Sequence, residues 1–452
     1  MNIVILINEV IELTKEINKK ILADFTENLN QDATNNVLKN AVAQVGIYQA
    51  SENPNAKTLL NPSFNVTVDT GKVSNQKHSG RCWLFAALNT LRTEFAQKNN
   101  LKDFELSQNY LSFYDRLEKA NYFYQNILET ADLPVDDRKV NTLFSSPSGD
   151  GGYWVYAANL IQKYGVVPNY VMPETQASDN TTEFNAVLNK MLRKNGIELR
   201  QMVQDKTDQS KIDQRVEEML SEVYKVCVYS FGMPPKEFEL SLHTDNDKLI
   251  EETSITPKDF LKRYFTMNLD DYVIVENSPQ KSKKYHQTYT IAESGNVVGG
   301  RIDKFLNLPI ERLEELTVEQ LKGNDPVWFG NDVLEESDRK KGYLLGNLYQ
   351  YDKLFNIDSE IEKGLRLDYK QAQVSHAMTI TGVNLVNGQA NRYKVENSWG
   401  SDNGENGYYM MDKKWFEDYV YEVIINKKYL TAAELSEYNQ DPIELPAWDS
   451  LA

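Results

Sequence analysis

The chain has 452 residues, of which 41% are hydrophobic and 25% charged, a composition that is typical of a globular protein and excludes wholesale disorder. The formal net charge of −17 argues against a general nucleic-acid or anionic-membrane binder, because phosphate groups repel such a surface. Two cysteines cannot form a disulfide framework, and no run of about 18 apolar residues is present to span a membrane. We therefore expect a cytoplasmic protein of several domains, or of one domain with insertions.

The N-terminal part of the chain is predicted to be an arm of helices and extended chain, residues 1–75. Its first 20 residues lack a basic segment and a small-residue cleavage site, so they are interpreted as part of an amphipathic helix and not as a signal peptide. Apolar residues recur at helical spacing through residues 8–45, whereas residues 51–75 are rich in Asn, Pro, Ser and Thr.

Residues 76–175 are predicted to form a helical lobe. A Gly/Ser/Pro loop at residues 144–153 interrupts it, and Gly165 ends its last helix. The periodicity of apolar residues predicts three helices, over residues 82–97, 106–120 and 154–164.

Residues 176–330 change character and are assigned to a mostly helical inserted subdomain. Helices are expected at residues 183–193, 211–224 and 310–321, and strands at residues 272–275, 285–291 and 326–329. Residues 331–440 are assigned to a β-rich lobe, because short apolar runs alternate with Gly turns there. Residues 441–452 form a C-terminal tail.

Motifs for metal and nucleotide chemistry are absent from the sequence. The chain has four His, with no His-Glu-x-x-His, and its two Cys do not form a Cys-x-x-Cys pair. No phosphate-binding loop and no Gly-x-Gly-x-x-Gly after a strand is present. We therefore predict neither a metal site nor a cofactor.

One segment, residues 75–83, combines several features of a nucleophile site. Cys82 lies at the predicted start of a helix, where unpaired N–H groups and the helix dipole favour a thiolate. The side chain of Gln76 and the backbone N–H of Cys82 can together form an oxyanion hole with two donors. The alternative is a buried structural cysteine, but Gln76, the small-residue turn and the helix start together favour a nucleophile.

A thiolate nucleophile needs a base, and His376 lies in a small, apolar, strand-like run. A lone His in such a run is more often structural. Asn397 follows 21 residues later, and its oxygen can accept a hydrogen bond from the imidazole, while Trp399 can shield that bond from water. Cys82, His376 and Asn397 thus form a complete set of nucleophile, base and orienting residue.

The order of these motifs resembles the papain superfamily of cysteine peptidases. The longer string Asn-Gln-Lys-x-Ser-Gly-Arg-Cys-Trp is similar to the bleomycin hydrolase branch, which includes the bacterial aminopeptidase C enzymes and their endopeptidase relatives. Cys82 and His376 lie 294 positions apart, against ~130–150 in single-domain relatives, as the inserted subdomain explains. The resemblance implies an α+β, two-lobed, papain-like fold with Cys82 in the helical lobe and His376 and Asn397 in the β-rich lobe.

The resemblance also implies a lowered thiol pKa, peptide substrates and a set of substrate-binding residues. Members of the branch form a homohexamer, in which the active sites face an internal channel and each C-terminal tail lies in its own cleft. In the aminopeptidases the terminal carboxylate pairs with the amino group of the substrate. The implied substrate-binding residues are Gly151, Gly152, Tyr153, Ser375, Ala377 and Ala452.

The length of the C-terminal tail distinguishes an aminopeptidase from an endopeptidase. An aminopeptidase is the first expectation, but this tail looks a few residues shorter than in family aminopeptidases. A shorter tail can leave the cleft open and permit internal cleavage, so an oligo-endopeptidase is the alternative.

A nucleic-acid-binding protein or a noncatalytic scaffold is the remote alternative. Residues 176–300 carry 16 Lys and Arg against 20 Asp and Glu, which argues against nucleic acid. The presence of all four site residues argues against an idle scaffold. His78 stands where many relatives have Ser, and it is not expected to act as the base, because the turn must direct Gln76 and Cys82 inward.

Overall fold

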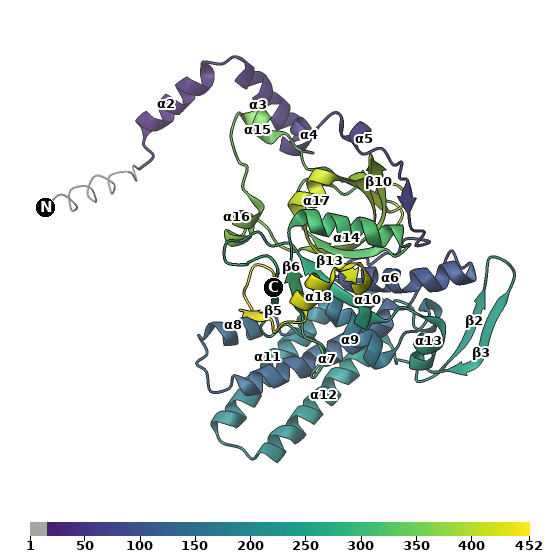
Figure 1. The fold of residues 1–452 in the computed structure, drawn as a ribbon. Coiled ribbons are helices and arrows are strands. Elements are labelled where there is room, and N and C mark those ends of the chain that lie inside the picture. Colours follow the sequence, from purple (N-terminus) through teal and green to yellow (C-terminus); the bar gives the residue numbers. More distant parts are fainter. Residues whose placement is uncertain (1–15) are drawn as a thin grey trace. The chain divides into compact units, whose positions relative to one another are not determined.

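A computed structural model describes residues 16–452 of the chain (Figure 1). Most of the amphipathic helix expected in the first 20 residues lies outside this described part. The chain divides into two compact units. The described part of the smaller unit consists of residues 16–54 and 347–360, and the larger unit consists of residues 55–346 and 361–452.

The smaller unit is made of helices. Its elements are α2 (Lys19–Asn30), α3 (Thr34–Val45), α4 (Ile47–Ser51) and α15 (Tyr351–Phe355). The side chain of Asn18 caps α2, and Gly46 ends α3 with a φ of 83°, a conformation that favours glycine. The backbone N–H of Asn53 donates to the carbonyl of Leu348 at 2.7 Å, which ties the two segments of this unit together.

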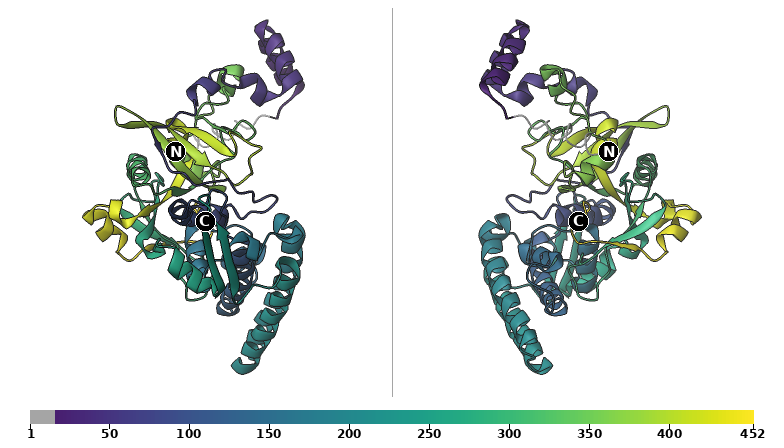
Figure 2. Two further views of the ribbon diagram at one scale, coloured as in Figure 1. Left: turned by 90° about the vertical axis from the view of Figure 1, so that its right-hand side faces the viewer. Right: turned by 90° about the vertical axis from the view of Figure 1, so that its left-hand side faces the viewer.

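The larger unit contains a sheet of twelve strands (Figures 1 and 2). Its order is β14-β5-β6-β4-β13-β7-β10-β11-β12-β9-β8, with β1 also paired to β10. The strands are β1 (Val66–Thr67), β4 (Tyr272–Glu276), β5 (Gln287–Ile291), β6 (Lys304–Asn307), β7 (Val327–Asn331), β8 (Ser337–Asp338), β9 (Tyr343–Leu344), β10 (His376–Val386), β11 (Gln389–Glu396), β12 (Tyr408–Asp412), β13 (Val420–Asn426) and β14 (Ile443–Leu445).

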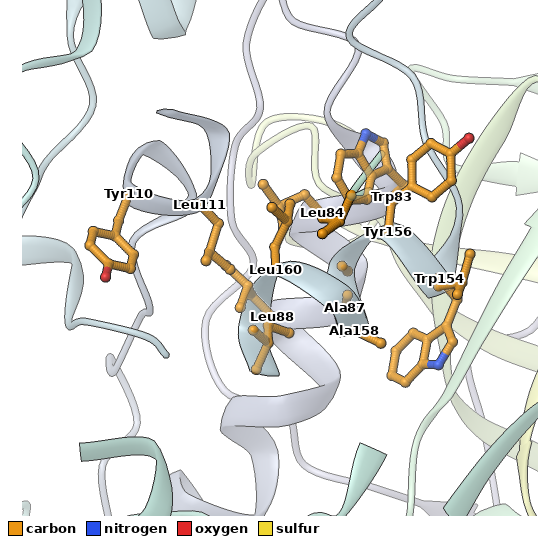
Figure 3. Packing of buried hydrophobic residues seen from close by; sticks show 14 of the residues in the cluster. Trp83, Leu84, Ala87, Leu88, Tyr110, Leu111, Trp154, Tyr156, Ala158 and Leu160 are labelled. Atoms are coloured by element: carbon orange, nitrogen blue, oxygen red, sulfur yellow. The ribbon is translucent and has the colours of Figure 1, made fainter. Parts of the chain in front are cut away.

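Helices pack against one face of this sheet and form the first of two cores. Trp328 of β7 faces this core, and its indole N–H donates to the carbonyl of Trp83 at 3.0 Å. Figure 3 shows side chains of three of these helices, with Trp83, Leu84 and Leu88 beside residues such as Tyr156 and Leu160. The main helices of this core are α6 (Cys82–Asn99), α7 (Gln108–Glu129), α9 (Trp154–Tyr164), α11 (Thr182–Gln204) and α12 (Gln209–Phe231).

The opposite face of the sheet carries the second core. Val327 and Phe329 face it, on either side of Trp328, because successive side chains of a strand point to opposite faces. Two helices, α14 (Ile310–Lys322) and α17 (Lys413–Tyr419), cover this face. The β-strands that carry His376 and Glu422 are therefore fixed from both sides.

Shorter elements complete the larger unit. A separate hairpin, β2 with β3, alternates buried and exposed residues along β2. The shorter elements of the larger unit are α5 (Ala56–Leu59), α8 (Arg138–Ser145), α10 (Gln176–Asp179), β2 (Phe238–His243), β3 (Leu249–Ile255), α13 (Pro257–Tyr264), α16 (Lys363–Asp368) and α18 (Ala432–Tyr438), with 3-10 turns at Asn169–Val171, Leu269–Asp271 and Lys427–Tyr429. Among residues 16–452 no helix combines the length and the apolar character that crossing a membrane requires.

The expected inserted subdomain, residues 176–330, takes part in the main sheet. Its helices come first along the chain, but strands β4, β5, β6 and β7 join the same sheet as β10. The expected boundary at residue 330 falls inside β7. A local run of apolar residues predicts a strand but does not specify its partner, so this pairing was not accessible from the sequence pattern.

Candidate active site

A cleft of about 620 Å³ lies in the larger unit between the start of α6 and the start of β10. Most of the residues that the sequence singles out line this cleft. They are Gln76, Cys82, Gly151, Gly152, Tyr153, Ser375, His376, Ala377 and Trp399. Two of the predicted site residues do not line the cleft. Asn397 is hydrogen-bonded to His376, and Ala452 belongs to the C-terminal tail.

The turn before α6 holds Gln76 next to the cleft. Lys77 adopts a left-handed conformation with φ of 52°, which reverses the chain. The backbone N–H of Gln76 donates to the carbonyl of Ser398 at 2.8 Å, and its side-chain oxygen accepts from the Ser398 hydroxyl at 2.6 Å. Its side-chain nitrogen donates to the carbonyl of Ser79 at 2.6 Å. These bonds use one amide hydrogen and leave the second for a ligand in the cleft.

Cys82 is the first residue of α6 and is partly exposed to the cleft. Burial raises the pKa of the Cys82 thiol, whereas the backbone N–H groups of Ala377, Trp83 and Cys82 itself lower it. The net direction is opposite to the lowered pKa that we expected, because desolvation of a thiolate at this buried helix end outweighs the three N–H groups. The contact with Ala377 places the sulfur beside the first residues of β10.

His376 begins β10 and is hydrogen-bonded to Asn397. The distance between Nε2 of His376 and Oδ1 of Asn397 is 3.0 Å, and both residues are buried. The ring of Trp399 lies 4.8 Å from the imidazole, centre to centre, and shields this bond. Because Asn397 accepts at Nε2, the ring is held with its other nitrogen, Nδ1, available on the cleft side. Burial lowers the pKa of His376 to about 4, so its neutral, proton-accepting form predominates at neutral pH.

The residues on either side of His376 have small side chains. The backbone N–H of Ser375 donates to the carbonyl of Asn331 at 2.9 Å, and its hydroxyl donates to Asp332 at 3.0 Å. Ala377 is 4% exposed and offers a methyl group to the cleft. Their small size keeps the cleft open beside the nucleophile.

The segment Gly151-Gly152-Tyr153 forms another wall of the cleft. A Cβ on Gly152 would lie 2.7 Å from the indole ring of Trp83, so only glycine permits this close approach. Within residues 16–452 no hydrogen bond occupies the backbone N–H or carbonyl of Gly152. An extended peptide can therefore pair with this residue through its main chain.

Two buried cations hold this wall in place, and sequence analysis did not identify them. Lys119 donates to the carbonyl of Gly151 at 2.7 Å, and Arg116 donates to the carbonyl of Gly149 at 2.6 Å. Both lie on α7 and are buried. Their spacing of three residues fits one helix face, but nothing in the local pattern distinguishes a buried cation from an exposed one.

Asp150 connects the Gly-rich wall to the nucleophile turn, and sequence analysis did not single it out either. Its Oδ2 accepts the backbone N–H of Gly80 at 2.9 Å, and its Oδ1 accepts from Asn185 at 3.0 Å. Asp150 also forms an ion pair with the fully buried Arg116, and its carbonyl accepts the indole N–H of Trp83 at 2.7 Å. One carboxylate thus positions two segments that are 70 residues apart in the chain.

We expect Asp150→Asn to lower the free energy of unfolding by about 3 kcal/mol, because it removes the carboxylate that forms an ion pair with the buried Arg116. Urea unfolding followed by fluorescence measures this as a lower midpoint at an unchanged slope. Asp213→Asn is the matched control, because Asp213 is exposed and its replacement is expected to cost less than about 0.5 kcal/mol. If Asp150→Asn unfolds at the same urea concentration as Asp213→Asn, the ion pair between Asp150 and Arg116 does not contribute to stability as expected.

The C-terminal tail is anchored to the larger unit at several points. Asp449 pairs with Lys283 at 3.0 Å, and the hydroxyl of Ser450 donates to Gln280 at 3.1 Å. Leu451 is 3% exposed, whereas Ala452 is exposed. Ala452 is not among the residues that line the cleft, and its assignment to substrate binding stays a prediction.

His78 and the second cysteine of the chain, Cys227, do not line the cleft. His78 is exposed and does not line the cleft, and its backbone pairs with the segment 179–181. Cys227 is 0% exposed within the first core. Among residues 16–452, no group of three or more His, Cys, Asp or Glu side chains is arranged to hold a metal ion.

Comparison with known proteins identifies the class to which this fold and cleft belong. Residues 16–452 match the Peptidase C1-like family. The chain is 45% identical to Aminopeptidase E of Lactobacillus helveticus, covering 98% of this chain and 99% of that one. It is 41% identical to Aminopeptidase C of the same organism, covering 97% and 98%. The crystal structure of PepW from Lactobacillus rhamnosis HN001 superposes with a TM-score of 0.95 at 44% identity, covering 97% and 99%.

The fold and the family together define a papain-like cysteine peptidase, and the predicted α+β fold class is confirmed. The chain belongs to the Peptidase C1-like family. The resemblance stated from the motifs is likewise confirmed, because relatives named Aminopeptidase C match nearly the full chain.

Proposed function

We propose that the protein is a cysteine aminopeptidase in which Cys82 is the nucleophile, His376 the base and Asn397 the orienting residue. The observation that carries this proposal is the 3.0 Å bond between Nε2 of His376 and Oδ1 of Asn397 beside a cleft that Cys82 also lines. It supports a base whose free nitrogen is available on the cleft side, as nucleophile activation requires.

In the proposed mechanism the sulfur of Cys82 attacks the carbonyl carbon of the peptide while His376 takes the thiol proton. The negative charge that develops on the carbonyl oxygen is stabilised by the Gln76 side chain and the backbone N–H of Cys82. His376 then passes its proton to the leaving amine, and the carbon–nitrogen bond breaks to leave a thioester. His376 next activates a water molecule, which hydrolyses the thioester and regenerates the thiol.

Release of N-terminal residues is supported by the names of the relatives, since Aminopeptidase E and Aminopeptidase C match this chain over nearly its full length. One observation favours the second candidate, an oligo-endopeptidase. Ala452 is not among the residues that line the cleft, where a terminal carboxylate would pair with the amino group of a substrate.

A mass-spectrometric time course on one ten-residue peptide and its N-acetylated copy distinguishes the two activities. We expect stepwise loss of residues from the free N-terminus and no cleavage of the acetylated peptide. Internal fragments from both peptides would overturn the aminopeptidase assignment and support the endopeptidase. Absence of any cleavage would overturn both.

We further propose that the protein acts in the cytoplasm as a homohexamer on peptide substrates. Both statements rest on the resemblance to the bleomycin hydrolase branch. Sedimentation equilibrium tests the assembly, with six chains of 52.0 kDa as the expected mass. A monomer or dimer at micromolar concentration would contradict it.

A further inference from the structure

The cleft is lined by a carboxylate that the mechanism above does not use. Glu422 lies on β13 and is 4% exposed, and it lines the cleft together with Tyr153 and Tyr156. Within residues 16–452 its carboxylate has neither a hydrogen-bond donor nor an ion-pair partner. A buried carboxylate without a partner is costly, which makes this side chain unusual among those that line the cleft.

The neighbouring strand leaves space for this carboxylate. Glu422 lies opposite Gly330 of β7, and a Cβ on Gly330 would lie 2.6 Å from Cγ of Glu422. Only glycine at position 330 therefore permits Glu422 to occupy its present place. Glu422 is the single acidic residue in an apolar strand run, Val-Tyr-Glu-Val-Ile-Ile. This pattern is visible in the sequence and could have identified Glu422 as an unusual buried residue.

Two further buried carboxyl groups lie near Glu422 and disfavour its ionisation. Glu276 is its cross-strand neighbour on β4, and Asp303 precedes β6. They are 6% and 4% exposed, and Oε2 of Glu276 has no hydrogen-bond partner. Lys283 is the cation close to Glu276, but it is already paired with Asp449 at 3.0 Å.

Ionisation of Glu422 is therefore unfavourable while the cleft is empty. Burial and the repulsion of Asp303 raise the pKa of Glu422 to about 8, and burial raises the pKa of Asp303 to about 7. A cation that enters the cleft and contacts Glu422 stabilises its carboxylate form over the carboxylic acid, so the proton of Glu422 is released. The resulting charge-assisted hydrogen bond in a desolvated site is a strong one.

We propose that Glu422 is a specificity-determining residue that binds a positively charged group of the peptide substrate. This inference rests on the proposed peptidase function of the same cleft. The group is an ammonium or a guanidinium, and a peptide has two sources of it. One is the free α-amino group at its N-terminus, and the other is a Lys or Arg side chain near the cleaved bond.

Peptide aldehydes test the proposal, because they bind reversibly to a thiol nucleophile and their affinity is measured as an inhibition constant. The first pair is leucinal and acetyl-leucinal, which differ in the α-ammonium group. The second pair is acetyl-lysyl-leucinal and acetyl-norleucyl-leucinal, which differ in a side-chain ammonium group. The inhibition constants are measured with the full-length enzyme and with Glu422→Gln, against one peptide that both enzymes cleave.

We expect Glu422→Gln to reduce the preference for the charged member of one pair by roughly 10- to 100-fold, the range for hydrogen bonds to charged groups. The pair that responds identifies the source of the cation. The preference is a ratio within one preparation, so partial unfolding of the variant does not alter it. The amide replaces the carboxylate at nearly equal volume, which favours folding.

Glu293→Gln is the matched control, because Glu293 also lines the cleft but is already paired with Lys139 at 2.5 Å. Its preference ratios are expected to stay within twofold of those of the unmodified enzyme. The inference is overturned if Glu422→Gln also stays within twofold in both pairs, or if Glu293→Gln reduces the preference equally. If none of the aldehydes inhibits the enzyme, the thiol assignment itself falls, which is a failure of the proposed function.

Discussion

Cys82→Ala is expected to reduce kcat/KM for peptide hydrolysis by roughly 10⁶-fold, the scale on which the loss of a nucleophile acts in comparable sites. The sulfur is the only protein atom that bonds to the carbonyl carbon of the substrate in the proposed mechanism, and alanine offers no replacement. The removed group is partly exposed at the helix start, so the fold and the assembly are expected to remain intact. Turnover measured on purified variant and unmodified protein at equal concentration checks this.

Cys227→Ala is the matched control for this experiment. Its thiol is fully buried in the first core and does not line the cleft, so turnover is expected to persist while stability falls slightly. Alkylation with iodoacetamide gives an independent readout, in which one label per chain is expected on Cys82 and none in Cys82→Ala. Peptidase activity that survives in a homogeneous Cys82→Ala preparation would contradict the nucleophile assignment.

Gln76→Ala is expected to lower kcat by roughly 10²–10³-fold, as the loss of one oxyanion-hole donor does in other acyl-transfer enzymes. Gln76 is 5% exposed, and its amide is held by Ser398 and Ser79, so its free N–H is oriented before the substrate arrives. An interaction that forms only as negative charge develops affects kcat and leaves KM nearly unchanged. Steady-state kinetics on one fluorogenic peptide amide separates the two constants.

Gln76→Glu and Ser398→Ala distinguish donation from positioning. Gln76→Glu keeps the shape of the side chain but replaces the donor with oxygen, so we expect a loss at least as large as that of Gln76→Ala. Ser398→Ala removes the 2.6 Å bond that orients the amide and is expected to cost roughly tenfold, since the donor remains. A Gln76→Glu enzyme with nearly full kcat would rule out an oxyanion-hole role for Gln76.

Much of the fold and of the candidate site was predictable from the sequence because the relevant signals are local. The start of α6 at Cys82 and the strand that begins at His376 follow from turn residues and from the apolar pattern around them. Asn397 and Gln76 were found because a nucleophile and a base need these partners. The structure brings His376 and Asn397 within 3.0 Å of one another, and their catalytic roles stay a prediction for the variants above to test.

The pKa of the thiol shows where a local argument fails. A helix start predicts a lowered pKa for Cys82, and its N–H groups do act in that direction. The burial of this helix end acts in the opposite direction and outweighs them. Burial is a property of the packed molecule, so a prediction made from one helix has no information about it.

The sequence by itself determined the α+β class, the family resemblance and the residues with the chemistry of a cysteine peptidase, because apolar periodicity, short motifs and the order of those motifs are all properties of the linear chain. Only the tertiary structure decided which strands share the main sheet, that Asp150 links Gly80 to the buried Arg116, and that Glu422 lies unpaired in the cleft. It also decided that the tail is anchored through Asp449 without Ala452 lining the cleft. These features depend on contacts between segments far apart in the chain, and a local pattern does not specify its distant partner.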